Sequence, residues 1–465
     1  MAGRPCPTFV GVIRSINYWI VLLGLVAGSL LSTVIPPMQS PDEVAHIQRA
    51  YLLGEGQILL DAPPGRDSGG MIDRNLSAYL AYYGPGLGND RTRRVSVIEN
   101  AWLEGLQWTD EEMFSAAPAT AYYFPLIYAP QAIGLEIGKQ FGLSIDTSYR
   151  LARFVVLCST LMILAIAFCL YPVSPLLIGL MILPMSAFQF ASASLDGTAT
   201  ALAVFAVAAF LRTYEDRQET RPWLLYACTA SIVLLLTSRI HLLPMLALVL
   251  ASTFYSKRDR YYLAFSVSLL CVLVWTLIAA KTTVDTRIIK SAATGDVLWF
   301  YLSDPLALFQ VFQNTWQDLS LTYFYRISFL GVLGYLDSAF TDMQYRFLYW
   351  CALILAALSI SVAGIRARWQ ASALLLVCAV VSVFFIFFAL LLTWTPHPAT
   401  VVHGVQGRYL LIPAIMVAYA VSGNAILNKS IARKLALVLV VALGAFTIFE
   451  TPPLLFERYF IAPKA

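Results

Sequence analysis

The 465-residue sequence is poor in charged residues, since Asp, Glu, Lys and Arg make up only 12% of it while hydrophobic residues make up 59%. A water-soluble protein of this length carries about 25% charged residues. The shortage therefore excludes an ordinary globular enzyme, a disordered scaffold and a nucleic-acid-binding protein. The seven cysteines show no metal-ligand spacing and imply no disulfide framework. Long apolar runs are abundant instead, and they predict an all-α, polytopic membrane protein.

The apolar runs predict about eleven transmembrane helices, because each comes near the roughly 20 residues that a bilayer requires. The candidate spans are residues 16–36, 152–171, 174–191, 197–213, 222–238, 240–256, 261–280, 344–364, 371–394, 408–427 and 435–452. Two long polar stretches, 37–121 and 281–343, are expected as large outer loops, and the first should contain short helices. The weaker run 122–141, with two prolines and two charges, is expected as an interfacial helix. The whole chain, 1–465, should form a single integral membrane domain.

Basic residues in short loops set the expected orientation, since Lys and Arg are enriched on the cytoplasmic side of membrane proteins. The basic loops are 212–221, 256–260, 365–369 and 428–434. All four become cytoplasmic if the N-terminus, with Arg4 and Arg14, is cytoplasmic and the run 122–141 does not cross. The first span is then an uncleaved anchor. The C-terminus and both large loops then face outward.

The first outer loop opens with Ser-Pro-Asp-Glu at 40–43, which has the form of a helix start with the serine as N-cap and the proline at the first helical position. His46 and Arg49 follow at spacings that place them on one helix face with Asp42 or Glu43. A carboxylate just outside the membrane, beside a histidine, fits a general base. Helix capping is the competing interpretation, because the helix dipole favours acids at an N-terminus.

Two further elements on the outward side carry polar groups. Asp196 lies at a short junction between two apolar spans, where an acid is energetically costly and indicates a function. Its competing role is to cap the helix that starts near residue 197. The segment 404–409 enters another span from outside, and Arg408 within it is a natural phosphate contact. The competing role of this segment is that of an interfacial anchor.

Basic residues retained on the side that normally avoids them suggest a bound phosphate or pyrophosphate, which arginine holds bidentately. Snorkelling toward lipid headgroups is the alternative for any one of these residues. The candidate binding residues on this face are Arg49, Arg150, Arg153, Asp196, Arg239, His241, Gln406, Arg408 and Tyr409.

Five stretches of the sequence together resemble the bacterial multi-pass membrane family catalogued as domain of unknown function 2142. In chain order they read PPMQSPDEVAHIQRAYLLGEG, YYFPLIYAPQAIGLEIGKQFG, LPMSAFQFASASLDGTATALA, GVLGYLDSAF and GVQGRYLLIPA. The resemblance extends over nearly the whole chain. It implies membership of the GT-C superfamily of membrane glycosyltransferases, whose catalytic acid follows the first span on the outer side.

The resemblance implies an enzyme that transfers a sugar, with inversion, from a polyprenyl-phosphate carrier to a cell-envelope glycan or lipid-linked acceptor. The reaction would occur on the outer face of the bacterial cytoplasmic (inner) membrane. Asp42 takes the place of the catalytic residue, with Glu43 and His46 beside it. Asp196 takes the place of an acidic turn in oligosaccharyltransferase catalytic subunits, which have more acids there and use a divalent metal. The single acid leaves open whether Mg²⁺ or Mn²⁺ binds at Asp42 and Asp196.

The alternative function is that of a transporter or flippase, or of a non-catalytic assembly protein, for lipid-linked glycans. Transporters place ionisable groups near the membrane midplane, often within internal repeats. The spans of this sequence are almost free of mid-span charges, it shows no repeat, and its candidate residues gather at one face. This pattern favours surface chemistry over translocation. The expected partners are the sugar donor, its acceptor and membrane lipid.

Overall fold

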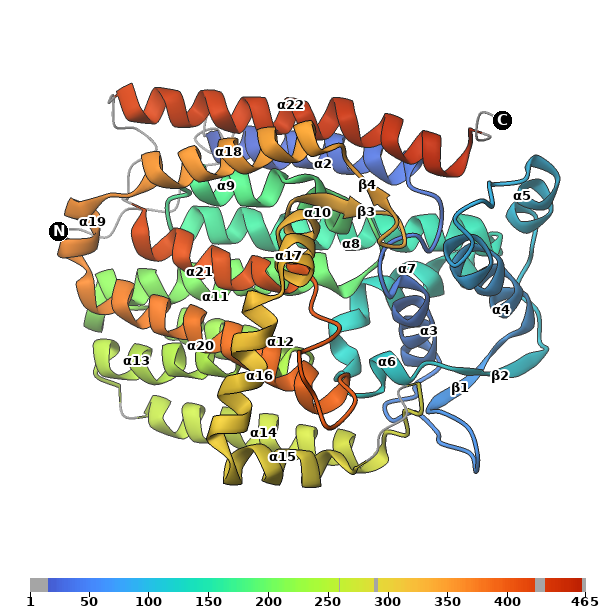
Figure 1. The fold of residues 1–465 in the computed structure, drawn as a ribbon, viewed down its shortest axis with the longest axis horizontal. Coiled ribbons are helices and arrows are strands. Elements are labelled where there is room, and N and C mark those ends of the chain that lie inside the picture. The colour runs from blue at the N-terminus through green and yellow to red at the C-terminus, as the bar shows by residue number, and fades with distance from the viewer. Residues whose placement is uncertain (1–15, 259, 288–291, 423–430, 462–465) are drawn as a thin grey trace.

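The computed structural model describes residues 16–258, 260–287, 292–422 and 431–461, most of which are helical. Long helices run side by side, and shorter elements gather at one end of this bundle (Figure 1). Within the described residues, five helical segments are long and apolar enough to cross a membrane. They are α8 (Ile145–Leu170), α11 (Leu195–Asp216) with η3 (Arg217–Glu219), residues 262–282 of α14 (Arg260–Thr282), α20 (Trp369–Thr393) and α22 (Ile431–Tyr459).

Four shorter apolar helical segments complete this set. They are formed by α2 (Ile16–Val34), by α12 (Pro222–Leu236), by η4 (Ile240–Met245) with α13 (Leu246–Ser256), and by η5 (Gly407–Leu410) with α21 (Leu411–Val421). The predicted helical membrane architecture is confirmed, whereas the number of eleven spans remains a prediction.

The predicted span 174–191 is divided in two. It forms α9 (Pro175–Ile182) and α10 (Pro184–Phe190), with Leu183 in an extended conformation between them. The residue before a proline is driven out of the helical region by the proline ring, so Pro184 ends the first helix and opens the second. The predicted span 344–364 is likewise divided, into α18 (Asp342–Ser359) and α19 (Val362–Ala367).

The central helix of the bundle is α11. Of its most apolar stretch 94% is buried, compared with 22% for α14 and for α22. Its first four turns are rich in alanine, which lets neighbouring helices approach closely. Because α11 begins with Leu195 and Asp196, the centre of the bundle carries an acid at the end where the short elements gather.

The predicted outer loop 37–121 folds into short elements at this end, seen on the right in Figure 1. They are α3 (Glu43–Gly54), β1 (Gly69–Asp73), α4 (Arg74–Ala81), η1 (Tyr82–Gly86), α5 (Val97–Glu104), β2 (Glu112–Ala116) and α6 (Pro118–Ala121). The antiparallel pair β1–β2 places Gly69 opposite Ala116 and Asp73 opposite Glu112. The sequence did not predict this small sheet, since only helices were expected in the loop.

The run 122–141 forms η2 (Pro125–Tyr128) and α7 (Ala129–Gln140). With 12 residues, α7 is about 18 Å long and too short to span a bilayer core of about 30 Å. It packs closely on α8, because a Cβ at Gly134 would overlap Ala152 and one at Gly138 would overlap Ser148. The helix therefore supports α3 and α8 at the end of the bundle.

The predicted outer loop 281–343 contains α15 (Thr294–Ser303), α16 (Pro305–Gln317), α17 (Leu319–Gly331) and a hairpin of β3 (Val332–Leu333) and β4 (Ser338–Ala339). In Figure 1, α16 and α17 cross the front of the bundle. The hairpin is tied to the last helix by an ion pair between Asp337 and Arg458. The segment that resembled the family here is therefore a structural hairpin.

The basic segments lie at the opposite end of the bundle from α3. The end of α11, the end of α13, helix α19 and the start of α22 are all on the left in Figure 1. The structure thus separates these basic segments from the loop that carries Asp42, as the argument from loop charge requires. The residues that were predicted to form the cytoplasmic N-terminus, including Arg4 and Arg14, lie outside the described residues, as does Lys429.

Candidate functional site

The candidate site lies where three segments distant in sequence meet: the turn before α3, the N-terminus of α11, and η5. Arg408 of η5 joins them, because its Nη2 donates to Asp42 at 2.6 Å and its Nη1 donates to Asp196 at 2.9 Å. Arg239, which precedes η4, forms a second ion pair with Asp196. Two acids and two arginines therefore form one alternating cluster, which we call the acid–arginine cluster.

Asp42 has an uncommon backbone conformation. Its φ of 62° and ψ of 5° lie in the left-handed region, which costs energy for any residue except glycine and which aspartate and asparagine tolerate best. It precedes the first helical residue, Glu43, so the expected N-cap at Ser40 is wrong. The carboxylate of Asp42 makes no capping hydrogen bond and is instead directed to Arg408. Such strained residues cluster at functional sites, and a capping hydrogen bond does not account for the carboxylate of Asp42.

Charges around the cluster fix the protonation of Asp42 and His46. Desolvation by itself would raise the pKa of Asp42, but the charge of Arg408 and its hydrogen bond outweigh this and hold the pKa below its ordinary value. Burial lowers the pKa of His46 to about 4, against a smaller opposing effect of Asp42. At neutral pH the carboxylate is therefore ionised and the imidazole neutral. The Nδ1 atom of His46 lies 2.8 Å from the hydroxyl of Tyr128.

Asp196 is buried in the first turn of α11. The side chain of Ser194 caps this helix and accepts from the backbone N–H of Asp196 at 3.3 Å, so the capping role considered for Asp196 belongs to Ser194. Besides the two arginines, the carboxylate accepts from Nε2 of Gln189 at 3.1 Å. A buried charge requires such partners. Asp196 thus holds Arg239 and Arg408 next to each other.

A small pocket opens beside Asp196, with a volume of about 20 Å³, which is room for about one water molecule. Its lining includes Gln189, Asp196, Arg239, His241, Arg408 and Tyr409. Outside the pocket, Oε1 of Gln406 accepts from Nε of Arg408 at 2.7 Å and so fixes the plane of the guanidinium. The predicted residues Arg239, His241, Gln406, Arg408 and Tyr409 are therefore brought together around Asp196.

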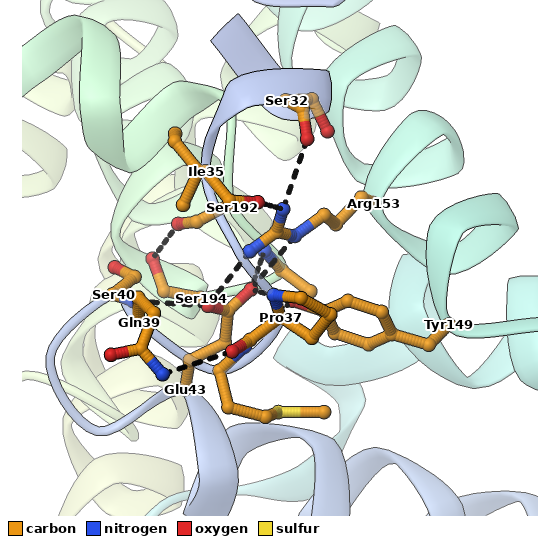
Figure 2. A network of polar contacts seen from close by, with 12 residues as sticks. Ser32, Ile35, Pro37, Gln39, Ser40, Glu43, Tyr149, Arg153, Ser192 and Ser194 are labelled. Carbon is orange, nitrogen blue, oxygen red and sulfur yellow. Dashed lines mark hydrogen bonds and ion pairs between the residues drawn. The ribbon is translucent and has the colours of Figure 1, made fainter. Parts of the chain in front are cut away.

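Glu43, predicted beside Asp42 in the chemistry, has a structural role. Its fully buried carboxylate accepts from Arg153 through Nε and Nη2, both at 3.2 Å, and from the hydroxyl of Tyr149 at 2.8 Å (Figure 2). The backbone N–H groups of Ala193 and Ser40 donate to it as well, at 2.6 and 3.1 Å. With five donors the carboxylate is saturated, so it has no lone pair left for an acceptor.

Arg153, predicted as a phosphate ligand, completes this buried network. Besides Glu43, it donates to the backbone carbonyls of Ser32, Ile35 and Pro36 at 3.1, 2.8 and 3.0 Å (Figure 2). These bonds fasten the end of α2 and the following turn to α8. The network therefore shapes the turn that presents Asp42, and Arg153 has no donor directed to a substrate.

Two other predicted phosphate ligands lie away from the cluster. Arg49 is fully buried on α3 and donates to the carbonyl of Gln57 at 3.2 Å, which fixes the loop after that helix. Arg150 lies on the surface of α8 and pairs with Asp146 through Nε at 2.6 Å. The structure therefore does not bring Arg49 or Arg150 to the acid–arginine cluster, because spacing along the sequence cannot show which face of the fold a side chain reaches.

The residues as arranged do not fit a divalent metal. The described residues contain no group of three or more His, Cys, Asp or Glu side chains able to hold a metal ion. Asp42 and Asp196, the two expected ligands, are each paired with arginine, and the guanidinium of Arg408 bonds to both. A Mg²⁺ or Mn²⁺ ion there would be repelled by the arginine charges.

Two residues of the site were missed by sequence reasoning. Gln189 lies in the apolar run 183–191, where an uncompensated polar side chain is costly and therefore signals a buried partner. Tyr128 lies in the segment 122–142 that resembled the family, but nothing in its spacing linked it to His46. The sequence could therefore have pointed to Gln189, whereas the contact between Tyr128 and His46 is visible only in the folded structure.

The model of the family described as "Predicted membrane protein (DUF2142)" matches residues 24–418. The matched range contains the acid–arginine cluster and the Glu43–Arg153 network. No curated protein and no solved structure matches the chain. The chain therefore belongs to the DUF2142 family of predicted membrane proteins.

Proposed function

We propose that this protein is a GT-C-type membrane glycosyltransferase that moves a sugar from a polyprenyl-phosphate carrier to a cell-envelope glycan or lipid-linked acceptor. The observation that carries the proposal is the pair formed by Asp42 and Arg408. The side chain of Asp42 is 48% exposed, that of Arg408 only 2%, and a second arginine lies beside them. A reachable carboxylate next to clustered cations suits attack by a hydroxyl on a phosphate-linked sugar.

In this proposal Asp42 is the general base. One of its oxygens takes the proton of the acceptor hydroxyl while that hydroxyl oxygen attacks the anomeric carbon of the sugar. The bond between this carbon and the phosphate oxygen breaks, and its electron pair leaves with the carrier phosphate. Arg408 and Arg239 compensate the charge that develops on the phosphate. A single displacement of this kind inverts the anomeric centre.

Binding of the donor would also activate the base. While Arg408 is bound to Asp42, the pKa of the carboxylate is held down and the group is a weak base. A donor phosphate competes for the same guanidinium, and its capture of Nη2 would release the carboxylate. The pocket of about 20 Å³ beside Asp196 is too small for a sugar phosphate, which fits a site that opens only through this exchange. Asp196 keeps both arginines in place during it.

The arrangement of charges supports a proposal for the position of the site relative to the membrane. The basic segments lie at the opposite end of the bundle from Asp42 (Figure 1). The enrichment of Lys and Arg on the cytoplasmic side therefore supports a site that faces outward from a bacterial cytoplasmic membrane. A lipid-linked donor would reach the site from the outer leaflet.

The test is sugar transfer by the purified protein from a panel of polyprenyl-phosphate sugars, comparing wild type with Asp42→Asn. Asparagine keeps the shape of the side chain and tolerates the left-handed backbone at this position. We expect Asp42→Asn to reduce kcat by about 10²-fold or more. Asp110→Asn, an exposed acid of the same outer loop, serves as the matched control and should keep wild-type activity.

EDTA should leave the transfer rate unchanged, because both candidate metal ligands are neutralised by arginine. Equal rates for wild type and Asp42→Asn would refute the assignment of the base. Tight carrier binding without turnover by the wild type, across the whole panel, would refute the transferase and favour a transporter or an assembly protein.

A further inference from the structure

A second cavity lies between α17 and α18, outside the acid–arginine cluster. It has a volume of about 470 Å³, and its lining includes Tyr323, Arg326, Leu330, Asp342, Arg346 and Tyr349. Helix α18 begins here, directly after the β3–β4 hairpin, and its other end leads to the basic helix α19 (Figure 1). The cavity therefore opens at the end of α18 that lies away from the basic segments.

The cavity carries an excess of positive charge. Arg326 and Arg346 are both exposed, and neither forms a salt bridge with any residue that the structure describes. The one acid of the lining, Asp342, accepts a hydrogen bond from the hydroxyl of Tyr323 at 2.9 Å. Two arginines and one aspartate give a net charge of +1, and a phosphate is the anion whose geometry the guanidinium group matches best.

The surface that continues from the cavity along α18 is apolar. Phe347, Trp350, Leu353 and Ile354 are between 42% and 55% exposed. The sequence predicts a membrane span over residues 344–364, and in such a span this surface would meet acyl or isoprenoid chains. A ligand with a phosphate head and an apolar tail therefore satisfies both the arginines and the exposed helix, whereas a free anion would satisfy the arginines alone.

The cavity is also joined to the acid–arginine cluster through α17. On the face of α17 that meets η5, Ser328 accepts from the backbone N–H of Gly407 at 2.8 Å. A Cβ at Gly407 would overlap the backbone of Tyr325 and Phe329, so η5 is pressed directly against α17. The helix that forms one wall of the cavity thus also supports the segment that holds Arg408.

We propose that the cavity between α17 and α18 binds the phosphate headgroup of a membrane lipid. Arg326 and Arg346 hold the phosphate, and the tail of the lipid lies along the apolar surface of α18. The two lipid sources that share this chemistry are an anionic phospholipid and a polyprenyl phosphate. The proposal goes beyond the transferase function and does not depend on it, since binding here is measured without turnover.

The experiment is native mass spectrometry of the full-length protein, titrated separately with phosphatidylglycerol, polyprenyl phosphate, phosphatidylcholine and inorganic phosphate. Wild type is compared with Arg326→Gln/Arg346→Gln. The matched control is Arg66→Gln/Arg91→Gln, which removes the same charge from exposed positions of the first outer loop. We expect at least one of the two anionic lipids to bind wild type and control equally and the cavity variant at least 10-fold more weakly. The stronger of the two identifies the source.

Three results would overturn the proposal. Unchanged lipid binding by the cavity variant would place the lipid elsewhere. An equal loss of lipid binding in the control variant would show that the effect comes from non-specific surface charge. Inorganic phosphate binding as tightly as both anionic lipids would remove the requirement for a lipid tail, and equally tight binding of phosphatidylcholine would remove the requirement for a net negative headgroup. If the double variant is unstable, Arg326→Gln and Arg346→Gln are tested singly, and binding that neither change weakens would also contradict the proposal.

Discussion

Arg408 donates to the carboxylate of Asp42 at 2.6 Å although the two residues are 366 positions apart in the chain. The pair extends from the interior to the surface, since the guanidinium is almost completely buried and the carboxylate is half exposed. A buried arginine that loses its only partner destabilises a protein strongly. If Arg408 released Asp42, its other terminal nitrogen would still donate to Asp196. It can therefore exchange Asp42 for a phosphate while part of its charge stays compensated.

This double attachment predicts the effect of Arg408→Lys. A lysine ammonium is a single point charge without the planar fork of arginine. It therefore cannot bond to Asp196 and, at the same time, to either Asp42 or a phosphate. We expect sugar transfer to fall by about 10²-fold or more. The control is Arg150→Lys, the same substitution at a surface arginine paired with Asp146, which should keep wild-type transfer. Wild-type turnover by Arg408→Lys would contradict the proposed exchange.

The long helices could be predicted from the sequence because burial in a membrane bundle requires continuous apolar runs. Helix α8 was predicted from residue 152 but begins at Ile145, since its first turns carry polar residues that cap the helix and form ion pairs. The break at Pro184 was not predicted, although the proline was visible, because apolar content alone does not register a lost helical hydrogen bond. The β1–β2 pair was missed since strand pairing joins segments about 40 residues apart.

The cluster itself was partly predictable. Asp196 was selected because an acid between two apolar spans is costly. Asp42 was selected as a carboxylate beside a histidine just outside the first span, and Arg239 and Arg408 as basic residues on the outward side. Arg153 was selected for its basic charge on the outward side and Arg49 for its helix spacing from the acids, but Arg153 is neutralised by Glu43 and Arg49 donates to a backbone carbonyl. The sequence shows which charges need partners, but only the fold shows whether a partner is a carboxylate, a carbonyl or a ligand.

The saturated carboxylate of Glu43 predicts a large loss of stability for Glu43→Gln. The substitution removes the negative charge that neutralises Arg153, whose side chain is only 2% exposed. Breaking a buried pair from one side costs about 3–5 kcal/mol. The control is Glu111→Gln, because Glu111 and its partner Arg74 are 68% and 67% exposed and such surface pairs contribute only about 0–1 kcal/mol. Thermal unfolding in detergent measures both, and similar shifts for the two variants would contradict the structural role of Glu43.

The close approach of α17 to η5 predicts that Gly407→Ala displaces Arg408. The added methyl group overlaps the backbone of Tyr325 and Phe329, which cannot rotate away as a side chain would. We expect a loss of about 1–3 kcal/mol in stability together with reduced sugar transfer. Gly295→Ala is the control, because its Cβ meets no atom within 4 Å and alanine favours the helix α15 in which it lies. An active, fully stable Gly407→Ala protein would show that η5 has room to shift.

The buried, neutral His46 predicts a loss of stability in mild acid. Its pKa is about 4 in the folded protein, against an ordinary value of 6.5, so the unfolded chain takes up the proton first as the pH falls. The contribution of His46 is therefore fully present above pH 6.5 and is lost progressively as the pH falls toward 4. Between pH 7 and pH 5 the loss should be on the order of 1–2 kcal/mol. Melting temperatures of wild type and His46→Gln at both pH values measure it, because glutamine can still bond to the hydroxyl of Tyr128 but does not titrate. Wild type should lose more stability than the variant over this interval, and equal losses would show that His46 takes up its proton without unfolding the site.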